Sequence, residues 1–333
     1  MTTLTSPTDL LATVPFLIGY QPSDAIVLMA LSDETISMAM RIDFPESITQ
    51  SEAAAIAARI AGERADAVLM VSYIPDSFEG AELVLQELTA ALLDCNLSLR
   101  ESIIVVSGRW RSLVCESLTC CPVEGSPLPE LLESRIAVEE VAKGKPLPFP
   151  DLATMAESIA PLPIDLALIE MISRVESIDY EGDALQVQRE GAAAVTDFIH
   201  DFATDGICRD RRLVATLLVR LHDLQVRDYA LGVMNEAESE LHYAAWRWLL
   251  RRAPEGYVAA PATLFAVACY ERGDGALANL ALERAQSDQP SYTLTKLLSQ
   301  VFRSGQPPTL FRKLRAELHP KVCATIFSGS MNS

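Results

Sequence analysis

The N-terminal third of the chain alternates between short apolar runs and stretches of helical periodicity. Two runs rich in Ile, Val and Met, residues 25–31 and 35–42, are separated by Ser-Asp-Glu and predict an antiparallel hairpin. The rest of this region predicts helix 6–17, helix 51–64, strand 67–73, helix 78–93, strand 102–106 and a further strand at 109–114. A β-α-β-α-β succession favours parallel pairing with helical crossovers, so the sequence predicts an α/β domain whose mixed sheet contains a β-hairpin and βαβ units.

Helical periodicity alone continues in the second half of the chain. Residues 143–163 contain five prolines and no convincing strand follows them, which indicates a domain boundary. The predicted helices are 165–175, 183–202, 211–221, 237–252, 261–271, 275–287, 291–302 and 309–318. We therefore predict an α/β domain at 1–145, a proline-rich linker at 146–163, an all-α helical domain at 164–320 and a C-terminal tail at 321–333.

One pair of predicted helices has the spacing of a repeat unit. Ala266, Ala278, Leu282, Ala285 and Pro290 follow the pattern of a tetratricopeptide unit, in which small residues let two antiparallel helices approach closely. One such unit cannot stabilise itself, so neighbouring helices must stack on it. The sequence thus predicts a tetratricopeptide-like helical domain, with an ordinary helical hairpin in a bundle as the alternative.

The composition and net charge of the chain limit which binding partners and which cellular compartment are expected. Half of the 333 residues are apolar, which allows sizeable cores, and the formal net charge is −18. A strongly acidic chain repels polyanions, because nucleic-acid affinity depends largely on Lys and Arg, so no nucleic-acid partner is expected. No apolar run approaches the roughly 20 residues that span a bilayer, and the seven cysteines at irregular spacings fit reduced thiols. We expect a cytoplasmic protein without membrane contact.

Three segments, residues 6–24, 108–128 and 261–276, carry a resemblance to a known family. The most distinctive is the second, which reads Gly108-Arg-Trp-Arg-Ser-Leu-Val-Cys-Glu-Ser-Leu-Thr-Cys-Cys-Pro-Val-Glu-Gly-Ser-Pro-Leu128. Together they resemble the actinobacterial proteins called "domain of unknown function 4192". The resemblance implies the two-part plan and a bacterial cytosol, and it brings no reaction, ligand, partner or catalytic residue. Leu113-Val114 departs from the aromatic residue expected there.

Cys115, Cys120 and Cys121 form the most suggestive cluster of side chains. Thiolates bind Zn(II), and a thiol of low pKa can act as a nucleophile or redox switch. The Cys-x4-Cys-Cys spacing lacks the separated Cys-x2-Cys pairs of structural zinc sites, and adjacent side chains are expected to point apart. We predict small buried thiols in a structured loop, with metal binding and a redox role as alternatives. No metal and no cofactor is expected.

Asp24, Asp43, Arg109 and Trp110 are the candidates for ligand contact, because each lies near the end of a predicted strand. The alternatives are that Asp24 caps a turn and that Trp110 packs at the domain boundary. All four histidines lie after residue 199, so the α/β domain alone cannot form a Ser-His-Asp or Cys-His site. Phosphate-binding loops, nucleophile elbows and His-Glu-x2-His motifs are also missing from the sequence.

These observations favour a non-enzymatic protein-interaction or regulatory protein with a protein partner, without a predicted catalytic residue. The helical array would offer the concave surface for that partner. A small-ligand-binding protein or enzyme, with its site at the strand ends of the α/β domain, is the second hypothesis. A thiol or metal sensor is the third.

Overall fold

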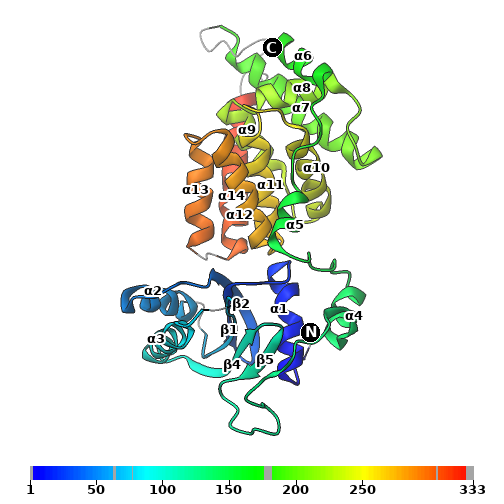
Figure 1. Cartoon of the computed structure of the whole chain (residues 1–333). Helices are drawn as coiled ribbons and strands as arrows, with labels where there is room; N and C mark the ends of the chain where they lie inside the picture. The colour runs from blue at the N-terminus through cyan, green and yellow to red at the C-terminus, as the bar shows by residue number, and fades with distance from the viewer. Residues whose placement is uncertain (1–2, 63–64, 77, 176–181, 305–306, 328–333) are drawn as a thin grey trace. The chain divides into compact units, whose positions relative to one another are not determined.

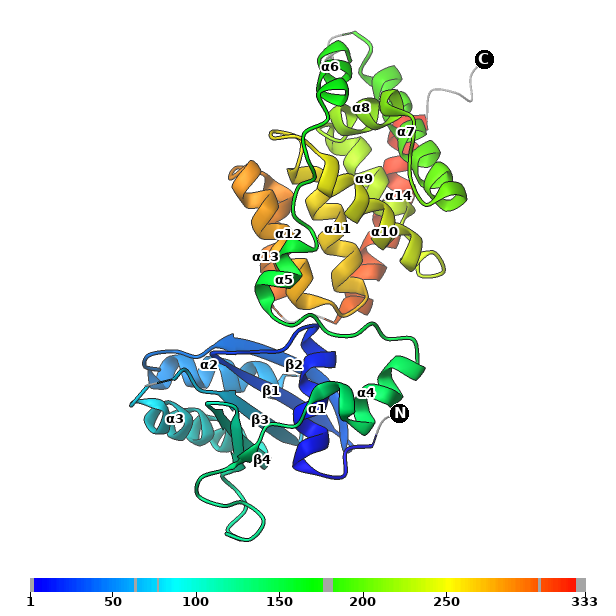
Figure 2. The ribbon, with the colours of Figure 1, turned by 45° about the vertical axis from the view of Figure 1, so that its right-hand side comes forward.

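The computed structural model of the chain describes residues 3–62, 65–76, 78–175, 182–304 and 307–327. The chain divides into two compact units, residues 1–155 and 156–333, called here the first unit and the helical unit. Figures 1 and 2 show the sheet of the first unit with its helices, and the stacked helices of the helical unit. The predicted combination of an α/β part and an all-α part is confirmed.

The first unit is built on one mixed sheet with the strand order β2-β1-β3-β4-β5-β6. Its strands are β1 (Ala25–Ser32), β2 (Thr35–Asp43), β3 (Ala67–Tyr73), β4 (Ser98–Val106), β5 (Arg109–Ser112) and β6 (Ser126–Pro127). The β1–β2 hairpin is confirmed. Only β3 and β4 pair in parallel, because β1 pairs antiparallel with both β2 and β3 and separates them. The helical crossovers are therefore as predicted, but the continuous parallel pairing is not.

Both tight hairpins use backbone conformations that suit two-residue turns. Asp33 and Glu34 have φ values of 50° and 60°, and Ser107 and Gly108 have φ values of 48° and 73°. Positive φ at both central residues is the type I′ geometry, whose twist matches that of the flanking strands. The β4–β5 turn thus starts β5 directly opposite the end of β4.

Helices cover the two faces of the sheet unequally. On one face α1 (Pro7–Ile18), capped by Ser6 and ended by Gly19, packs on a core that reaches from β1 out to Trp110 of β5. On the other face α2 (Gln50–Ala61) and α3 (Ala81–Asp94) pack on β1 and β3, and that core ends at Leu99 and Ile104 of β4. The remaining elements of this unit are a short 3-10 turn (Leu131–Glu133), α4 (Arg135–Ala142) and the start of α5 (Leu152–Glu157).

The helical unit is a stack of helices around α11. Its helices are α6 (Leu166–Arg174), α7 (Ala184–Asp205), α8 (Arg211–Arg220), α9 (Leu224–Val233), α10 (Ser239–Arg252), α11 (Ala259–Glu271), α12 (Gly275–Asp288), α13 (Thr293–Arg303) and α14 (Pro308–Phe327). Helices α11 and α12 carry the small residues Ala266, Ala278 and Ala285, each fully buried. The predicted pair of close helices is present, while its assignment as a tetratricopeptide-like unit stays a prediction.

Two segments differ from the sequence prediction. Helix α14 continues through Pro320 to Phe327, so the segment predicted as a C-terminal tail is helical as far as the structure describes it. Part of the predicted linker is fixed to the helical unit, because Arg247 and Arg251 donate hydrogen bonds to the carbonyl oxygens of Ser158 (2.8 Å) and Ala160 (3.2 Å). Among the described residues, no helix is long and apolar enough to cross a membrane.

Candidate functional site

Residues 113–125 join β5 to β6 and contain Cys115, Cys120 and Cys121; we call this segment the three-thiol loop. Its base is held by the β5–β6 pair and by Arg109, whose Nε and Nη2 donate to the carbonyl oxygens of Glu124 (2.8 Å) and Gly125 (2.6 Å). Gly125 has a φ of +71°, and a Cβ added there would lie 2.9 Å from the Trp110 carbonyl oxygen. A side chain at this position would therefore strain the closure of the loop.

A serine sets the direction of the first half of the loop. Ser112 Oγ accepts hydrogen bonds from the amides of Val114 (3.1 Å) and Cys115 (3.0 Å) and donates to Glu101 Oε1 at 2.6 Å. Glu101 Oε1 also accepts from the Ser102 amide at 2.8 Å, which fixes the carboxylate on β4. This chain of hydrogen bonds anchors Cys115 to the sheet. Serine hydroxyls favour such turns, because they accept hydrogen bonds from backbone amides two or three residues later.

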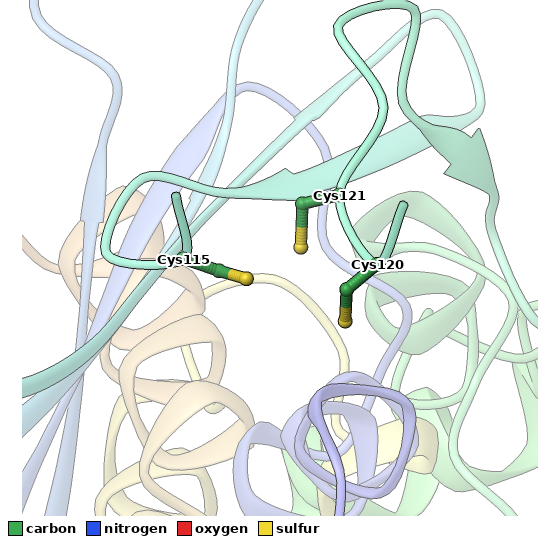
Figure 3. A group of neighbouring side chains, drawn as sticks. All are labelled: Cys115, Cys120 and Cys121. Atoms are coloured by element: carbon green, nitrogen blue, oxygen red, sulfur yellow. The ribbon is translucent and has the colours of Figure 1, made fainter. Parts of the chain in front are cut away.

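A second turn brings the adjacent cysteines to the same place as Cys115. The carbonyl oxygen of Ser117 accepts from the amides of Cys120 (3.1 Å) and Cys121 (2.8 Å). The sulfur atoms of the three cysteines lie within 4.8 Å of one another. Figure 3 shows the three side chains at this turn. The expectation that the adjacent side chains diverge is therefore wrong. The helix-like turn curls the backbone, so that neighbouring side chains need not alternate as they do along an extended strand.

The three thiols differ in exposure and in acidity. Cys120 is exposed, Cys115 half-buried and Cys121 buried, so the prediction of buried thiols holds for only one of them. Hydrogen bonds from the Ser117 amide and from the Cys121 thiol lower the pKa of Cys115, against the opposing effects of burial and of the Glu101 charge. Burial raises the pKa of Cys121, and the two neighbouring cysteines raise it further, although the Ser112 amide acts in the opposite direction. These opposite pKa shifts favour the thiolate at Cys115 over the thiolate at Cys121.

The spacing of the sulfur atoms suits a single ion of a thiophilic metal. Zinc–sulfur bonds are about 2.3 Å long, so thiolates around one ion lie roughly 4 Å apart, and small side-chain movements would bring these three into that range. Within the described part of the chain, the grouping contains no fourth ligand. Three thiolates with an open position can complete a trigonal Cu(I) site, or a tetrahedral zinc site with one ligand from solvent.

The candidates for ligand contact share one edge of the sheet. Ala25, next to Asp24, is paired with Asp43 and with Tyr73 at the end of β3, while β4 ends beside the turn to Arg109. Asp24 and Asp43 are exposed there, Asp24 has a φ of 46°, and Asp43 forms an ion pair with Arg41 at 2.6 Å. Asp24, Asp43 and Arg41 therefore lie together at the β1–β2 end of this edge, whereas β3 and β4 separate them from Arg109 on β5.

Arg109 and Trp110 have structural roles in this arrangement. The Arg109 guanidinium donates its hydrogen bonds to the backbone of the three-thiol loop. Trp110 is 7 % exposed and packs in the core under α1. Two open cavities, of about 640 Å³ in the helical unit and about 610 Å³ in the first unit, are lined by other residues than the strand-end candidates. The strand-end candidates therefore do not line either cavity.

Comparison with known proteins adds a family to this description. The profile of the family described as "Domain of unknown function (DUF4192)" matches residues 7–309, which include both units and the three-thiol loop. Comparison with curated proteins and with solved structures gives no match.

Proposed function

The chain belongs to the family described as "Domain of unknown function (DUF4192)", and since that description names no activity, we propose a function from the three-thiol loop. The loop binds one thiophilic metal ion, zinc or Cu(I), reversibly, and the protein acts as a metal-responsive regulatory protein and not as an enzyme. The observation that carries this proposal is the convergence of the three sulfur atoms within 4.8 Å.

Reversible binding fits the site better than a structural role. Structural zinc sites are closed by four protein ligands, whereas this group of three leaves one position open and has Cys120 exposed. The first unit also has two apolar cores of its own, on the two faces of the sheet, and neither contains a loop cysteine. A metal ion is therefore not needed to fold the unit, and its arrival and departure can serve as a signal.

The sequence-based expectations fit within this proposal. A reducing cytoplasm keeps the three thiols free to bind an ion. An actinobacterial origin, which rests on the resemblance of the sequence, and a tetratricopeptide-like partner surface in the helical unit complete the proposed picture. In this proposal, metal binding at the three-thiol loop regulates the interaction of the protein with its protein partner.

Metal titration of the full chain tests the proposal. The protein is purified under argon with a reductant and stripped with a chelator; Zn²⁺ and Cu(I) are then titrated separately in competition with a chromophoric chelator. We expect one equivalent of at least one of these ions to bind, and the C115S/C121S double variant to lose at least about 100-fold in affinity, since two of three ligands are removed. The matched control is C323S, because Cys323 is a half-buried thiol on α14 outside the cluster.

Two outcomes contradict the proposal. Stoichiometric binding that survives in the C115S/C121S variant would place the ion elsewhere. Failure to bind either ion, together with a disulfide among the loop cysteines after mild oxidation, would assign the cluster to thiol redox chemistry.

A further inference from the structure

The face of the sheet that α2 and α3 cover is left open beside α3. The core on the α1 side extends to Trp110 of β5, whereas the core on the α2/α3 side ends at Leu99 and Ile104 of β4. Neighbouring strands lie about 4.8 Å apart and a helix with its side chains is about 10 Å wide, so a strip about one helix wide stays uncovered over β4 and β5. The helical layer thus has a vacant position.

A groove of about 610 Å³ occupies this vacant position. One wall is a continuous face of α3, and the rest of the lining comes from Ile74 just after β3, Ile104 of β4, Arg111 of β5 and Leu113 just after β5. The α3 wall presents Glu82, Leu85 and Leu93 to the groove, and Glu79 lies just before this helix. Leu93 and Leu113 are 55 % and 46 % exposed, which places large apolar side chains in contact with solvent on both walls. Exposed apolar patches of this kind mark binding surfaces.

The charges on the groove specify an occupant. Glu79 and Glu82 lie toward the start of α3, and Arg111 lies on the opposite wall, where it is the register partner of Ile104. In the ranges that the structure describes, none of these three side chains forms an ion pair. A complementary partner therefore presents basic groups to the two glutamates and an acidic group to Arg111.

We propose that this groove binds an amphipathic helix of a partner protein. Since the α3 wall runs from Glu82 to Leu93, the helix has about three turns at 1.5 Å per residue. It places apolar side chains at i, i+3 or i+4, and i+7 into the groove, two basic residues beside Glu79 and Glu82, and one acidic residue beside Arg111. The groove lies on the first unit, not on the helical array where the sequence predicts the partner surface, and Leu113 is the one lining residue that belongs to the three-thiol loop.

Helix α3 provides matched variants for the test. Leu93→Glu removes an apolar contact and places a charge in the groove, whereas Leu83→Glu makes the same change at a 69 % exposed leucine of α3 outside the groove. Glu82→Lys reverses a charge at the groove, and Glu87→Lys does so at an exposed glutamate of α3 that does not line it. All four positions are on the surface of the same helix, so changes in folding are expected to be small and equal.

The experiment selects binders from a displayed library of helical 14-residue peptides, using the full-length protein as bait. The best peptide is then labelled, and its Kd is measured by fluorescence anisotropy. We expect the selected peptides to carry apolar residues at helical spacing and a positive net charge. Leu93→Glu should raise the Kd by about 10-fold or more, as expected for a central apolar contact, and Glu82→Lys by about 3-fold or more, as expected for a charge at the rim. The two controls, Leu83→Glu and Glu87→Lys, should have Kd values within about 2-fold of the wild type.

Three results would overturn the inference. Selected peptides could lack the helical apolar spacing or the positive charge, or the Leu83→Glu control could weaken binding as much as Leu93→Glu. Light scattering could also show a dimer of the wild-type chain that Leu93→Glu dissociates, and the groove would then belong to a second copy of the chain.

Discussion

The cysteines of the two units show how environment gives one residue type opposite properties. In the three-thiol loop, three cysteines gather on a surface turn, and backbone and thiol hydrogen bonds lower the pKa of Cys115. In the helical unit, Cys269 is completely buried in α11 and burial raises its pKa well above the ordinary value. Cys208 is 5 % exposed, and burial raises its pKa to about 11.

The difference follows from what surrounds each sulfur atom. Cys269 lies on a helix that is buried along most of its length, where a thiol packs as a small apolar group. Cys115 is held in a loop where the Ser117 amide and the neighbouring thiols donate hydrogen bonds to its sulfur, which stabilises the charged thiolate. We therefore expect the loop cysteines to react or bind metal as thiolates, and the cysteines of the helical unit to pack as small apolar side chains.

Alkylation should separate the two groups of cysteines most widely. The thiolate is the reactive form, and the lowered pKa of Cys115 against a pKa of about 11 for Cys208 gives Cys115 by far the larger thiolate fraction at about pH 8. Burial of Cys208 widens the difference in reactivity. We expect iodoacetamide to label Cys115 in the native apo protein while Cys208 and Cys269 stay unlabelled, as measured by peptide mass spectrometry over time. The same reaction in urea should label all three at similar rates. Native labelling of Cys269 before Cys115 would contradict the comparison.

Serine substitution should affect stability in the opposite order, with a larger loss at the buried helical cysteine than at a cysteine of the three-thiol loop. Cys269→Ser places a hydroxyl group in an apolar core, and we expect it to lower the free energy of unfolding by about 1–2 kcal/mol, since the hydroxyl can recover part of the cost by bonding to its own helix. Cys120→Ser, on an exposed turn, should change it by less than about 0.5 kcal/mol. Urea denaturation followed by circular dichroism measures both. Equal effects would mean that Cys269 is not a packing residue.

The sequence predicted where the helices and strands lie along the chain better than it predicted which strands pair in the sheet. Extended apolar runs located the β1–β2 hairpin and β3, and helical patterns located α2 and α3. The position of β1 between β2 and β3 is a long-range choice that no local pattern contains. Helix α9 was missed, although Asp223 caps it, because its ten residues have only a weak helical periodicity of apolar positions. The helix predicted at 309–318 continues to Phe327, where Val322 and Ile326 pack in a core cluster with Ala192 of α7.

The candidate site shows the same limit. The sequence singled out Cys115, Cys120 and Cys121 by their proximity along the chain. It predicted the wrong orientation for the side chains of Cys120 and Cys121, because no local pattern indicated the turn at Ser117. The support from Glu101 on β4 depends on the pairing of β4 with β5. Arg109 was predicted to face a ligand, and its guanidinium contacts the loop backbone instead. Local sequence thus supplied the chemical groups, and the sheet supplied their geometry.

The smallest expected effect tests whether Arg109 holds the loop in the form that its thiols require. Arg109→Ala removes two hydrogen bonds to Glu124 and Gly125, which we expect to lower the free energy of loop opening by about 1 kcal/mol, because the guanidinium is exposed and solvent replaces part of the contact. Amide hydrogen exchange at Cys120 and Cys121 should then be about five-fold faster. Arg100→Ala is the control, since Arg100 pairs with Glu34 at an exposed site. Unchanged exchange in Arg109→Ala would mean that the Ser112 and Ser117 turns alone keep the cysteines together.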